Sequence, residues 1–213
     1  CGSGGMFVQS EKFVLAHGCY WHRCRFCDTA LDYIGRYEEP DIDNLIDDLL
    51  TVVRATSFNG FHFVDEAASP GLLRKLAERL IARGIVITWW TNIRFERAFT
   101  PALANLLARA GCIAVCGGLE TACDRTLRLM QKGIDCATAA RVCRGFADAG
   151  IMVHAYLMYG FPTQTFRETI SALDLVRRLF KDGSLHAAYW HRFALTVHSP
   201  MHSEANSSDI TVT

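Results

Sequence analysis

The stretch Cys19-Tyr20-Trp21-His22-Arg23-Cys24-Arg25-Phe26-Cys27 places three cysteines close together in the sequence. It directly follows an apolar run, Phe13-Val14-Leu15-Ala16, which is typical of a short buried strand. The cysteines are therefore expected on the loop that leaves the carboxyl end of this strand. Three thiolates are one too few for a closed zinc site, and an iron–sulfur cube also takes four cysteine ligands. The loop predicts an iron–sulfur cube with one iron left open for a small molecule.

The composition fits a single α/β domain. The chain has 213 residues, 50% of them hydrophobic, and single α/β barrels often run to about 200–250 residues. Lys plus Arg and Asp plus Glu both number 22, so no overall charge attracts nucleic acid or an anionic membrane. There is also no run of about eighteen apolar residues that would span a membrane. We therefore expect neither a nucleic-acid partner nor membrane attachment.

The cysteines indicate a reducing compartment. Their count of nine is odd, which does not suggest a secreted disulfide framework, and the start of the chain has no signal-peptide pattern. A cytoplasmic location is therefore expected. Cys112 and Cys116 lie in an apolar, strand-like run, and Cys123, Cys136 and Cys143 lie in helical stretches. Buried free cysteines are common, so we predict that these five pack in the core.

Strand-like and helical patterns alternate along the rest of the chain. Short apolar runs predict strands over 61–64, 85–90, 112–116, 151–158 and 186–197, in addition to the first. Apolar residues at helical spacing predict helices from residue 41, over 71–83, from residue 100, over 124–149 with a break at Gly133, and over 166–180. Six strand-then-helix repeats without a final helix predict a parallel sheet with helices outside. Six repeats are too few for a full barrel of eight, so an open, partial barrel is expected.

Polar residues follow most of the predicted strands. In barrels of this kind the chemistry lies at the carboxyl ends of the strands. The residues at these ends are Cys19, Cys24, Cys27, Asp65, Glu66, Asn92, Arg94, Glu120, Gly160 and Pro162. These residues follow five different strands, whose carboxyl ends meet at one rim of the barrel. Chance explains a single such residue easily, but it explains suitable residues after all five strands much less well. The sequence thus predicts one functional site at this rim.

The cysteine motif resembles that of the radical S-adenosylmethionine superfamily. Gly18-Cys19-Tyr20-Trp21 leading into Cys24-Arg25-Phe26-Cys27-Asp28 is most similar to the radical domain of its cobalamin-binding branch, and the resemblance extends from Phe13 to about Pro200. It implies a partial (β/α)6 TIM-like barrel and a 4Fe–4S cluster held by the three cysteines. It also implies reductive cleavage of S-adenosylmethionine to methionine and a 5′-deoxyadenosyl radical. The spacing departs from the family, with Cys-x4-Cys in place of Cys-x3-Cys, so His22 is a competing ligand.

The same resemblance implies residues that bind S-adenosylmethionine. Asp65 or Glu66 would receive its amino group, because one of these carboxylates stands where the family has a glutamate. Glu120 would contact the ribose or the amino group, and Lys132 would pair with the methionine carboxylate. Three residues would lie against adenine: Phe26, Gly160 and Pro162.

Several alternatives stay open. Cys19, Cys24 and Cys27 with His22 nominally suit a zinc site, and a degenerate barrel without catalysis would be a scaffold. The resemblance implies a small-molecule or peptide substrate and an electron donor such as flavodoxin or ferredoxin. Methyl transfer and hydrogen abstraction are both open, and so is dependence on cobalamin in the full-length protein. We assign residues 1–12 to a linker or expression remnant, 13–200 to the barrel and 201–213 to a loose polar tail.

Overall fold

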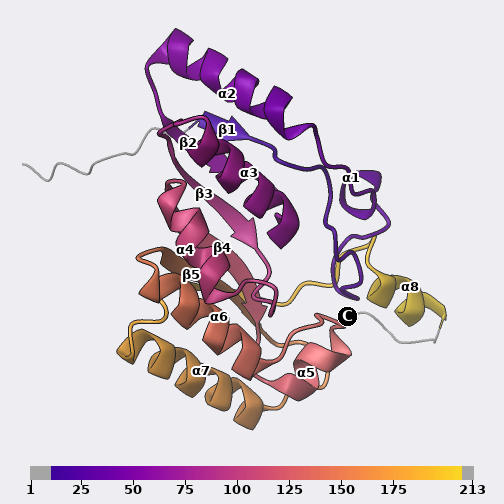
Figure 1. The fold of residues 1–213 in the computed structure, drawn as a ribbon. Coiled ribbons are helices and arrows are strands. Elements are labelled where there is room, and N and C mark those ends of the chain that lie inside the picture. Colours follow the sequence, from indigo (N-terminus) through magenta and orange to yellow (C-terminus); the bar gives the residue numbers. More distant parts are fainter. Residues whose placement is uncertain (1–10, 208–213) are drawn as a thin grey trace, which may run out of the picture.

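The protein is built around one parallel sheet of six strands. The computed structural model describes residues 11–207 and shows the sheet order β1-β2-β3-β4-β5-β6, so each strand pairs with the next in the sequence (Figure 1). The strands are β1 (Glu11–Phe13), β2 (Gly60–Phe63), β3 (Thr88–Ile93), β4 (Cys112–Glu120), β5 (Met152–Tyr159) and β6 (Ala187–Arg192). β1 pairs with β2 and β5 with β6, but no pairing joins β6 to β1, and the predicted open, partial barrel is confirmed.

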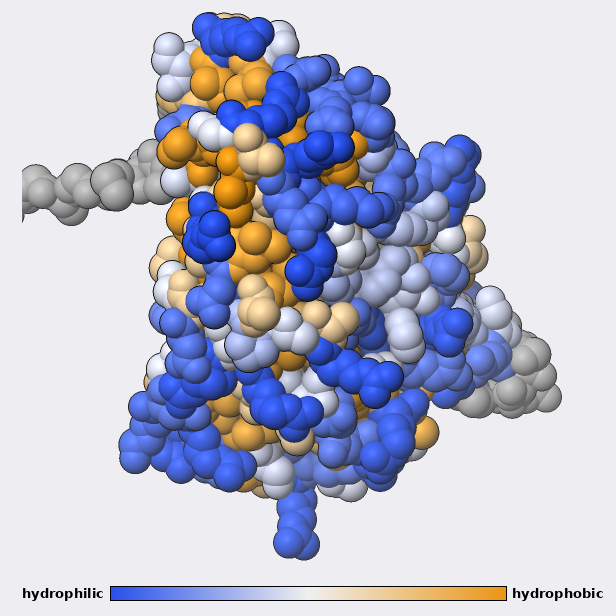
Figure 2. Space-filling view, viewed as in Figure 1, coloured by the Kyte–Doolittle hydropathy of each residue, from blue (hydrophilic) through white to orange (hydrophobic). Residues whose placement is uncertain are grey.

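Helices connect the strands and cover the outer face of the sheet. They are α1 (Asp32–Gly35), α2 (Ile42–Thr56), α3 (Pro70–Ala82), α4 (Pro101–Arg109), α5 (Asp124–Leu129), α6 (Cys136–Asp148), α7 (Phe166–Lys181) and α8 (Pro200–Ser207). Figure 2 shows that the visible outer face is mostly hydrophilic, with hydrophobic surface gathered near α2 and the first strands. Within the described range, no helix is long and apolar enough to cross a bilayer.

Side-chain caps define where most of the long helices begin. The carboxylates of Asp41 and Asp135 accept hydrogen bonds from backbone N–H groups of α2 and α6, and the hydroxyls of Ser69 and Thr100 do so for α3 and α4. Thr165 and Glu168 form a capping box at the start of α7. Each cap satisfies a helix N–H that has no partner within the helix. Because helices and strands run in opposite directions, these starts all lie near the carboxyl ends of the strands.

The core lies between the sheet and the helices. Fully buried residues on β2 and β3, such as Phe61, Phe63 and Trp89, pack against leucines of α3 and α4. The indole nitrogen of Trp89 donates to the carbonyl oxygen of Ala110 at 2.8 Å, so this polar atom is not left unsatisfied in the core. A smaller apolar cluster of Met130, Met158 and Phe161 lies apart from the main core.

The expected first strand is wrong in its position. β1 ends at Phe13, before most of the run 13–16 that was expected to form it. The ladder stops because the N–H of Ala16 donates to the Asp65 carboxylate at 2.6 Å, where a strand neighbour would offer a carbonyl. Leu15 and Ala16 are nevertheless buried, which explains their apolar character.

The expected loose tail is also wrong where the structure describes it. Residues 200–207 form α8, and the N–H of Met201 donates to the carbonyl of Arg25 at 3.0 Å. The hydroxyl of Ser199 accepts a hydrogen bond from the N–H of His202 at 3.3 Å, near the start of this helix. The rest of the predicted tail and most of the predicted linker lie outside the described residues.

Candidate active site

A cavity of about 390 Å³ opens at the carboxyl ends of the strands. Seven of the ten residues proposed from sequence as ligands or cofactor contacts line it: Cys19, Cys24, Cys27, Asp65, Glu66, Glu120 and Lys132. Asn92, near the end of β3, and Arg94, directly after β3, line the cavity as well. The convergence of sulfur, carboxylate and cationic groups from β1 to β4 on one space is therefore present in the structure.

The cysteine loop is fixed by backbone contacts on both sides. The N–H of Cys19 donates to the carbonyl of Ile34, and the N–H of Arg25 donates to the carbonyl of Met130, both at 3.0 Å. Gly18 has a φ of +77° and a side chain there would collide with the backbone of Arg36. Only glycine fits both constraints without strain. The shape of the loop is thus set by contacts with α1 and with the residue after α5.

The end of the described chain closes over the same loop. The hydroxyl of Thr196 donates to the carbonyl of Phe26 at 3.4 Å, and the N–H of His198 donates to the carboxylate of Asp28 at 3.2 Å. These partners are 170 residues apart in sequence. The cysteine loop is therefore held between α1, α5 and the segment that leads into α8.

Cys24 occupies an environment that favours its thiolate form. The Cys27 thiol donates a hydrogen bond to the Cys24 sulfur, and Lys132 and Arg94 add positive charge. Together they lower the pKa of Cys24 to about 6, although its burial acts in the opposite direction. The pKa of Cys27 is raised because its proton is held in that hydrogen bond. A thiolate is the form that binds a metal, so this chemistry suits ligation.

Asp65 and Glu66 enter the cavity in different ways. Asp65 is only 2% exposed, and one of its oxygens accepts from Ala16 while the other has no hydrogen-bond partner. Glu66 is exposed. Asp65 therefore holds the segment that leads to the cysteine loop, and it keeps one buried acceptor oxygen free. Its burial raises the pKa of Asp65 to about 6.

Asp65→Asn is expected to remove a pH dependence of stability. The ordinary aspartate pKa is about 3.9, so between about pH 4 and pH 6 the folded state binds more protons than the unfolded state. The free energy of unfolding should therefore fall as pH rises, by roughly 3 kcal/mol in total for this group. Urea unfolding of the unloaded protein from pH 4 to pH 7 should show the variant gaining stability relative to wild type as pH rises.

The control for that prediction removes a carboxylate elsewhere. Asp48→Asn changes an exposed residue of α2 that is outside the cavity. The Asp48→Asn variant should not gain stability relative to wild type as the pH rises. A constant difference between Asp65→Asn and wild type over the whole pH range would show that Asp65 does not titrate in this way.

Glu120 and Lys132 form a buried ion pair at the base of the cavity. The ammonium of Lys132 donates to the Glu120 carboxylate at 2.5 Å, and the two side chains are 9% and 8% exposed. Glu120 ends β4 at a φ of +59°, a conformation that is costly for a residue other than glycine. A side chain at Gly118 would fall 2.0 Å from the Glu120 carboxylate, so only glycine allows this approach.

Arg94 connects this ion pair to the cysteine loop. It is 2% exposed and donates to the carbonyl of Lys132 at 2.6 Å. Its guanidinium lies over the ring of Trp21, 4.2 Å from the centroid. This arginine therefore orders the wall between the cavity and the loop rather than standing free in solvent.

The predicted adenine contacts lie outside the cavity lining. Phe26 packs against the smaller apolar cluster, with its ring centroid 5.9 Å from the Lys132 ammonium, while Gly160 and Pro162 are exposed. The N–H of Gly160 donates to the Gln164 side chain at 2.9 Å. No contact in the structure tests these three residues, and their role stays a prediction.

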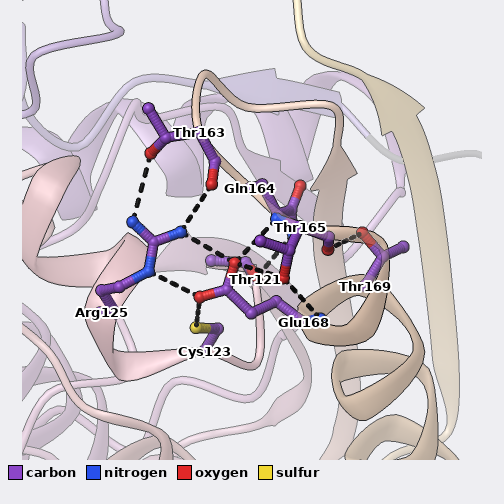
Figure 3. A network of polar contacts seen from close by, with 8 residues as sticks. All are labelled: Thr121, Cys123, Arg125, Thr163, Gln164, Thr165, Glu168 and Thr169. Atoms are coloured by element: carbon purple, nitrogen blue, oxygen red, sulfur yellow. Dashed lines mark hydrogen bonds and ion pairs between the residues drawn. The ribbon is translucent and has the colours of Figure 1, made fainter.

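The loop that carries Gly160 and Pro162 is tied to α5 by a polar network (Figure 3). Arg125 makes a bidentate ion pair with Glu168, at 2.6 and 2.8 Å, and donates to the carbonyl of Thr163. Gln164 donates in turn to the hydroxyl of Thr121, directly after β4. The network fixes the turn after β5 relative to the end of β4, although none of its eight labelled residues lines the cavity.

Sequence reasoning missed two cavity residues. Cys116, which was expected in the core, is buried but lines the cavity, and Tyr156 lines it beside Cys116. The Tyr156 hydroxyl donates to the Cys116 sulfur. The available signal was the position of Cys116 directly before Gly117-Gly118, at the end of the strand expected over 112–116 and in the middle of β4 as the structure has it.

The zinc alternative stays a prediction. Among residues 11–207, no three His, Cys, Asp or Glu side chains are grouped so as to hold a single metal ion. The Nδ1 atom of His22 instead lies 3.1 Å from the carbonyl oxygen of Cys19, within its own loop. The three sulfurs share a cavity without forming a mononuclear site.

Comparison with known proteins identifies the family. The family model described as the radical SAM superfamily matches residues 13–176, which is most of the chain. This chain belongs to the radical SAM superfamily. An uncharacterised methyltransferase of Pyrococcus horikoshii is 22% identical to it over 168 residues, which are 78% of this chain and 36% of that protein.

Two solved structures share the fold of this radical SAM domain. The methyltransferase TsrM of Kitasatospora setae, determined with cobalamin and a 4Fe–4S cluster, superimposes with a TM-score of 0.78 at 20% identity, over 93% of this chain and 39% of that one. The cobalamin-dependent radical enzyme OxsB gives 0.75 at 13% identity, over 95% and 36%. The chain thus spans less than two-fifths of each of these proteins.

Proposed function

We propose that this radical SAM domain holds a 4Fe–4S cluster on Cys19, Cys24 and Cys27 and reductively cleaves S-adenosylmethionine to methionine and a 5′-deoxyadenosyl radical. The observation that carries the proposal is the cavity on which the three sulfurs meet carboxylates and a lysine in a chain of this family. When bound, the cluster supplies the electron that breaks a carbon–sulfur bond of S-adenosylmethionine.

The residues of the site fit such a cofactor pair chemically. Cys24 is poised as a thiolate beside Lys132, and an ammonium close to thiolates offsets part of the negative charge of the ligand set. The free buried oxygen of Asp65 and the carboxylate of Glu66 are suited to an ammonium group such as the one that S-adenosylmethionine carries. The fit of the cluster and S-adenosylmethionine to this site therefore rests on the sulfur, carboxylate and ammonium groups that line the cavity.

The protein's own part in the chemistry is to bind, to orient and to exclude water. Cys19, Cys24 and Cys27 would be the ligands of the cluster. Asp65 or Glu66 would orient the amino group of S-adenosylmethionine. Lys132 is nearly buried and holds Glu120 in one position. Because its charges are held in fixed positions in a low-dielectric wall, the site needs little reorganisation free energy when a charged cofactor binds.

The domain's wider role is part of the same proposal. We propose that the complete protein is an enzyme acting on a small molecule or a peptide in a reducing compartment, by methyl transfer or hydrogen abstraction. A dependence on cobalamin is supported by the likeness to two cobalamin-binding proteins of the family. Adding and omitting cobalamin in assays of the complete protein tests that extension.

Anaerobic reconstitution with iron and sulfide tests the core of the proposal. The loaded protein should show a broad visible absorption that dithionite bleaches, and it should release 5′-deoxyadenosine and methionine from S-adenosylmethionine. Stoichiometric zinc without either product would favour the zinc site. An intact cluster that never cleaves S-adenosylmethionine would favour a scaffold.

A further inference from the structure

The turn between β5 and α7 has a strained backbone. The N–H of Gln164 donates to the carbonyl of Phe161 at 2.9 Å, so Pro162 and Thr163 are the two central residues of a tight turn. Thr163 has a φ of +67°. Proline at the first central position and a positive φ at the second are characteristic of a type II turn, in which glycine usually takes the second position. Because threonine is β-branched, this conformation is strained at Thr163.

One guanidinium binds both polar groups of Thr163 (Figure 3). Arg125 donates to the carbonyl oxygen of Thr163 at 2.8 Å and to its hydroxyl at 3.2 Å. The same guanidinium donates to the carboxylate of Glu168 at 2.6 and 2.8 Å. A strained residue persists only where its surroundings fix it. Arg125 supplies that constraint, because its planar, rigid array of donors holds the carbonyl and the hydroxyl in one orientation.

The ion pair of Arg125 and Glu168 differs from an ordinary pair at the surface. An isolated exposed pair contributes little to stability, because water screens the charges and two long side chains lose freedom. Here two N–H groups meet two carboxylate oxygens, which is the geometry in which such a pair is strongest. Glu168 also accepts from the N–H of Thr165 at 2.8 Å, directly before α7. The guanidinium is therefore fixed relative to the start of this helix.

Gln164 joins the same turn to the candidate active site. Its side-chain oxygen accepts from the N–H groups of Gly160 and Phe161, at 2.9 and 3.3 Å. Its side-chain nitrogen donates to the hydroxyl of Thr121 at 3.2 Å. Thr121 is fully buried and directly follows Glu120, which lines the cavity. The turn is thus fixed on one side to the wall of the cavity and on the other side, through Thr163, to α5 and α7.

We propose that Arg125 is a positioning residue for S-adenosylmethionine. By holding Thr163 in its strained conformation, it keeps the backbone of Gly160 and Pro162 in the shape that receives the adenine of this molecule. The inference rests on the proposed function and on the contact with adenine that the sequence predicts for these two residues. Arg125 does not line the cavity, so it acts through the turn and not by contact with S-adenosylmethionine.

Loss of Arg125 is expected to affect only the nucleoside end of S-adenosylmethionine. Without its hydrogen bonds, Thr163 would relax toward a negative φ, and the backbone at Gly160 and Pro162 would move with it. Lys132, which is expected to bind the methionine carboxylate, is held by Glu120 and not by Arg125. The affinity for S-adenosylmethionine should therefore depend on Arg125, whereas the affinity for methionine alone should not.

The test compares Arg125→Ala with Arg177→Ala in the reconstituted protein. Arg177 is exposed and pairs with Asp174 within α7, so its substitution removes the same charge and an ion pair without affecting the turn. Anaerobic calorimetry measures the affinities for S-adenosylmethionine and for methionine. Arg125→Ala should bind S-adenosylmethionine about tenfold more weakly than wild type, because one strained residue is released, and should bind methionine as wild type does. Arg177→Ala should match wild type with both.

A second substitution separates positioning from a general loss of structure. Thr163→Gly in the Arg125→Ala protein removes the strain, because glycine adopts a positive φ readily, and it should restore most of the affinity for S-adenosylmethionine. If Arg125 only stabilised the surface, the glycine would restore no affinity, and that result would overturn the proposal. If Arg125→Ala does not fold, Arg125→Gln takes its place.

Hydrogen exchange keeps this test separate from the proposed function. In the protein prepared without iron, the peptide of residues 159–165 should exchange its backbone N–H groups about tenfold faster in Arg125→Ala than in wild type and Arg177→Ala, as measured by mass spectrometry. Equal exchange rates, or equal affinities for S-adenosylmethionine when wild type binds it, would overturn this inference alone. A reconstituted wild type that binds no S-adenosylmethionine would overturn the proposed function and, with it, this inference.

Discussion

Cys24→Ala is expected to abolish iron binding. Two thiolates cannot hold a cube that takes three from this loop, and Cys24 is the most buried of the three, at 5% exposed. Its environment also favours the thiolate and lowers its pKa to about 6. Iron and sulfide content after anaerobic reconstitution, together with visible absorption, measures the effect. We expect near-complete loss of both.

The matched control is another buried cysteine. Cys143 packs in the main core on α6 and does not line the cavity, so Cys143→Ala should keep iron at the wild-type level. Far-ultraviolet circular dichroism of both variants checks that the fold is retained. Iron in Cys24→Ala close to that in wild type would mean that the cysteine loop is not the ligand set.

Glu120→Gln is expected to have two large effects at once. It leaves the ammonium of Lys132 buried without its charge partner, and removing one member of a buried ion pair costs about 3–5 kcal/mol of stability. It should also weaken binding of S-adenosylmethionine by about 1–3 kcal/mol, the usual cost of losing a hydrogen bond to a charged group. Iron content should be unchanged. Urea unfolding and calorimetry with S-adenosylmethionine measure the two effects.

A second substitution separates the two effects. Glu120→Gln with Lys132→Met removes the stranded ammonium and should recover much of the lost stability, while the affinity for S-adenosylmethionine stays low. If Glu120→Gln alone unfolds at the wild-type urea concentration, the ion pair is not stabilising the base of the cavity. An unchanged affinity would remove Glu120 from the cofactor site.

Much of the fold could be predicted because its signals are local. The alternation of apolar runs and helical spacing gave six parallel strands, and the break near Gly133 separates α5 from α6 as expected. The position of β1 could not be predicted, since the N–H of Ala16 is satisfied by a carboxylate from residue 65. α8 was missed for a similar reason, because contacts with residues far earlier in the chain hold it, including the bond from Met201 to Arg25.

The candidate site was predictable to the extent that it lies at the ends of strands. The cysteines, Asp65, Glu66 and Glu120 were found from that rule, and they line one cavity. The pairing of Lys132 with Glu120 was not foreseen, because it depends on a strained backbone at Glu120 and on the space left by Gly118. An apolar strand pattern predicts that Cys116 is buried, but it does not show whether the side chain faces the core or the cavity. Cys116 was therefore assigned to the core.

The hydrogen bonds that join Phe26 and Asp28 to Thr196 and His198 have a consequence for biosynthesis. Every strand pairs with its sequence neighbour, so the sheet can be extended by one strand at a time as the chain is synthesised. The cysteine loop leaves the ribosome before residues 196–198 are made, so its last contacts form only after all six strands have been synthesised. Metal insertion is therefore expected to follow the synthesis of residues 196–198, and until then the three thiols depend on a reducing environment for protection.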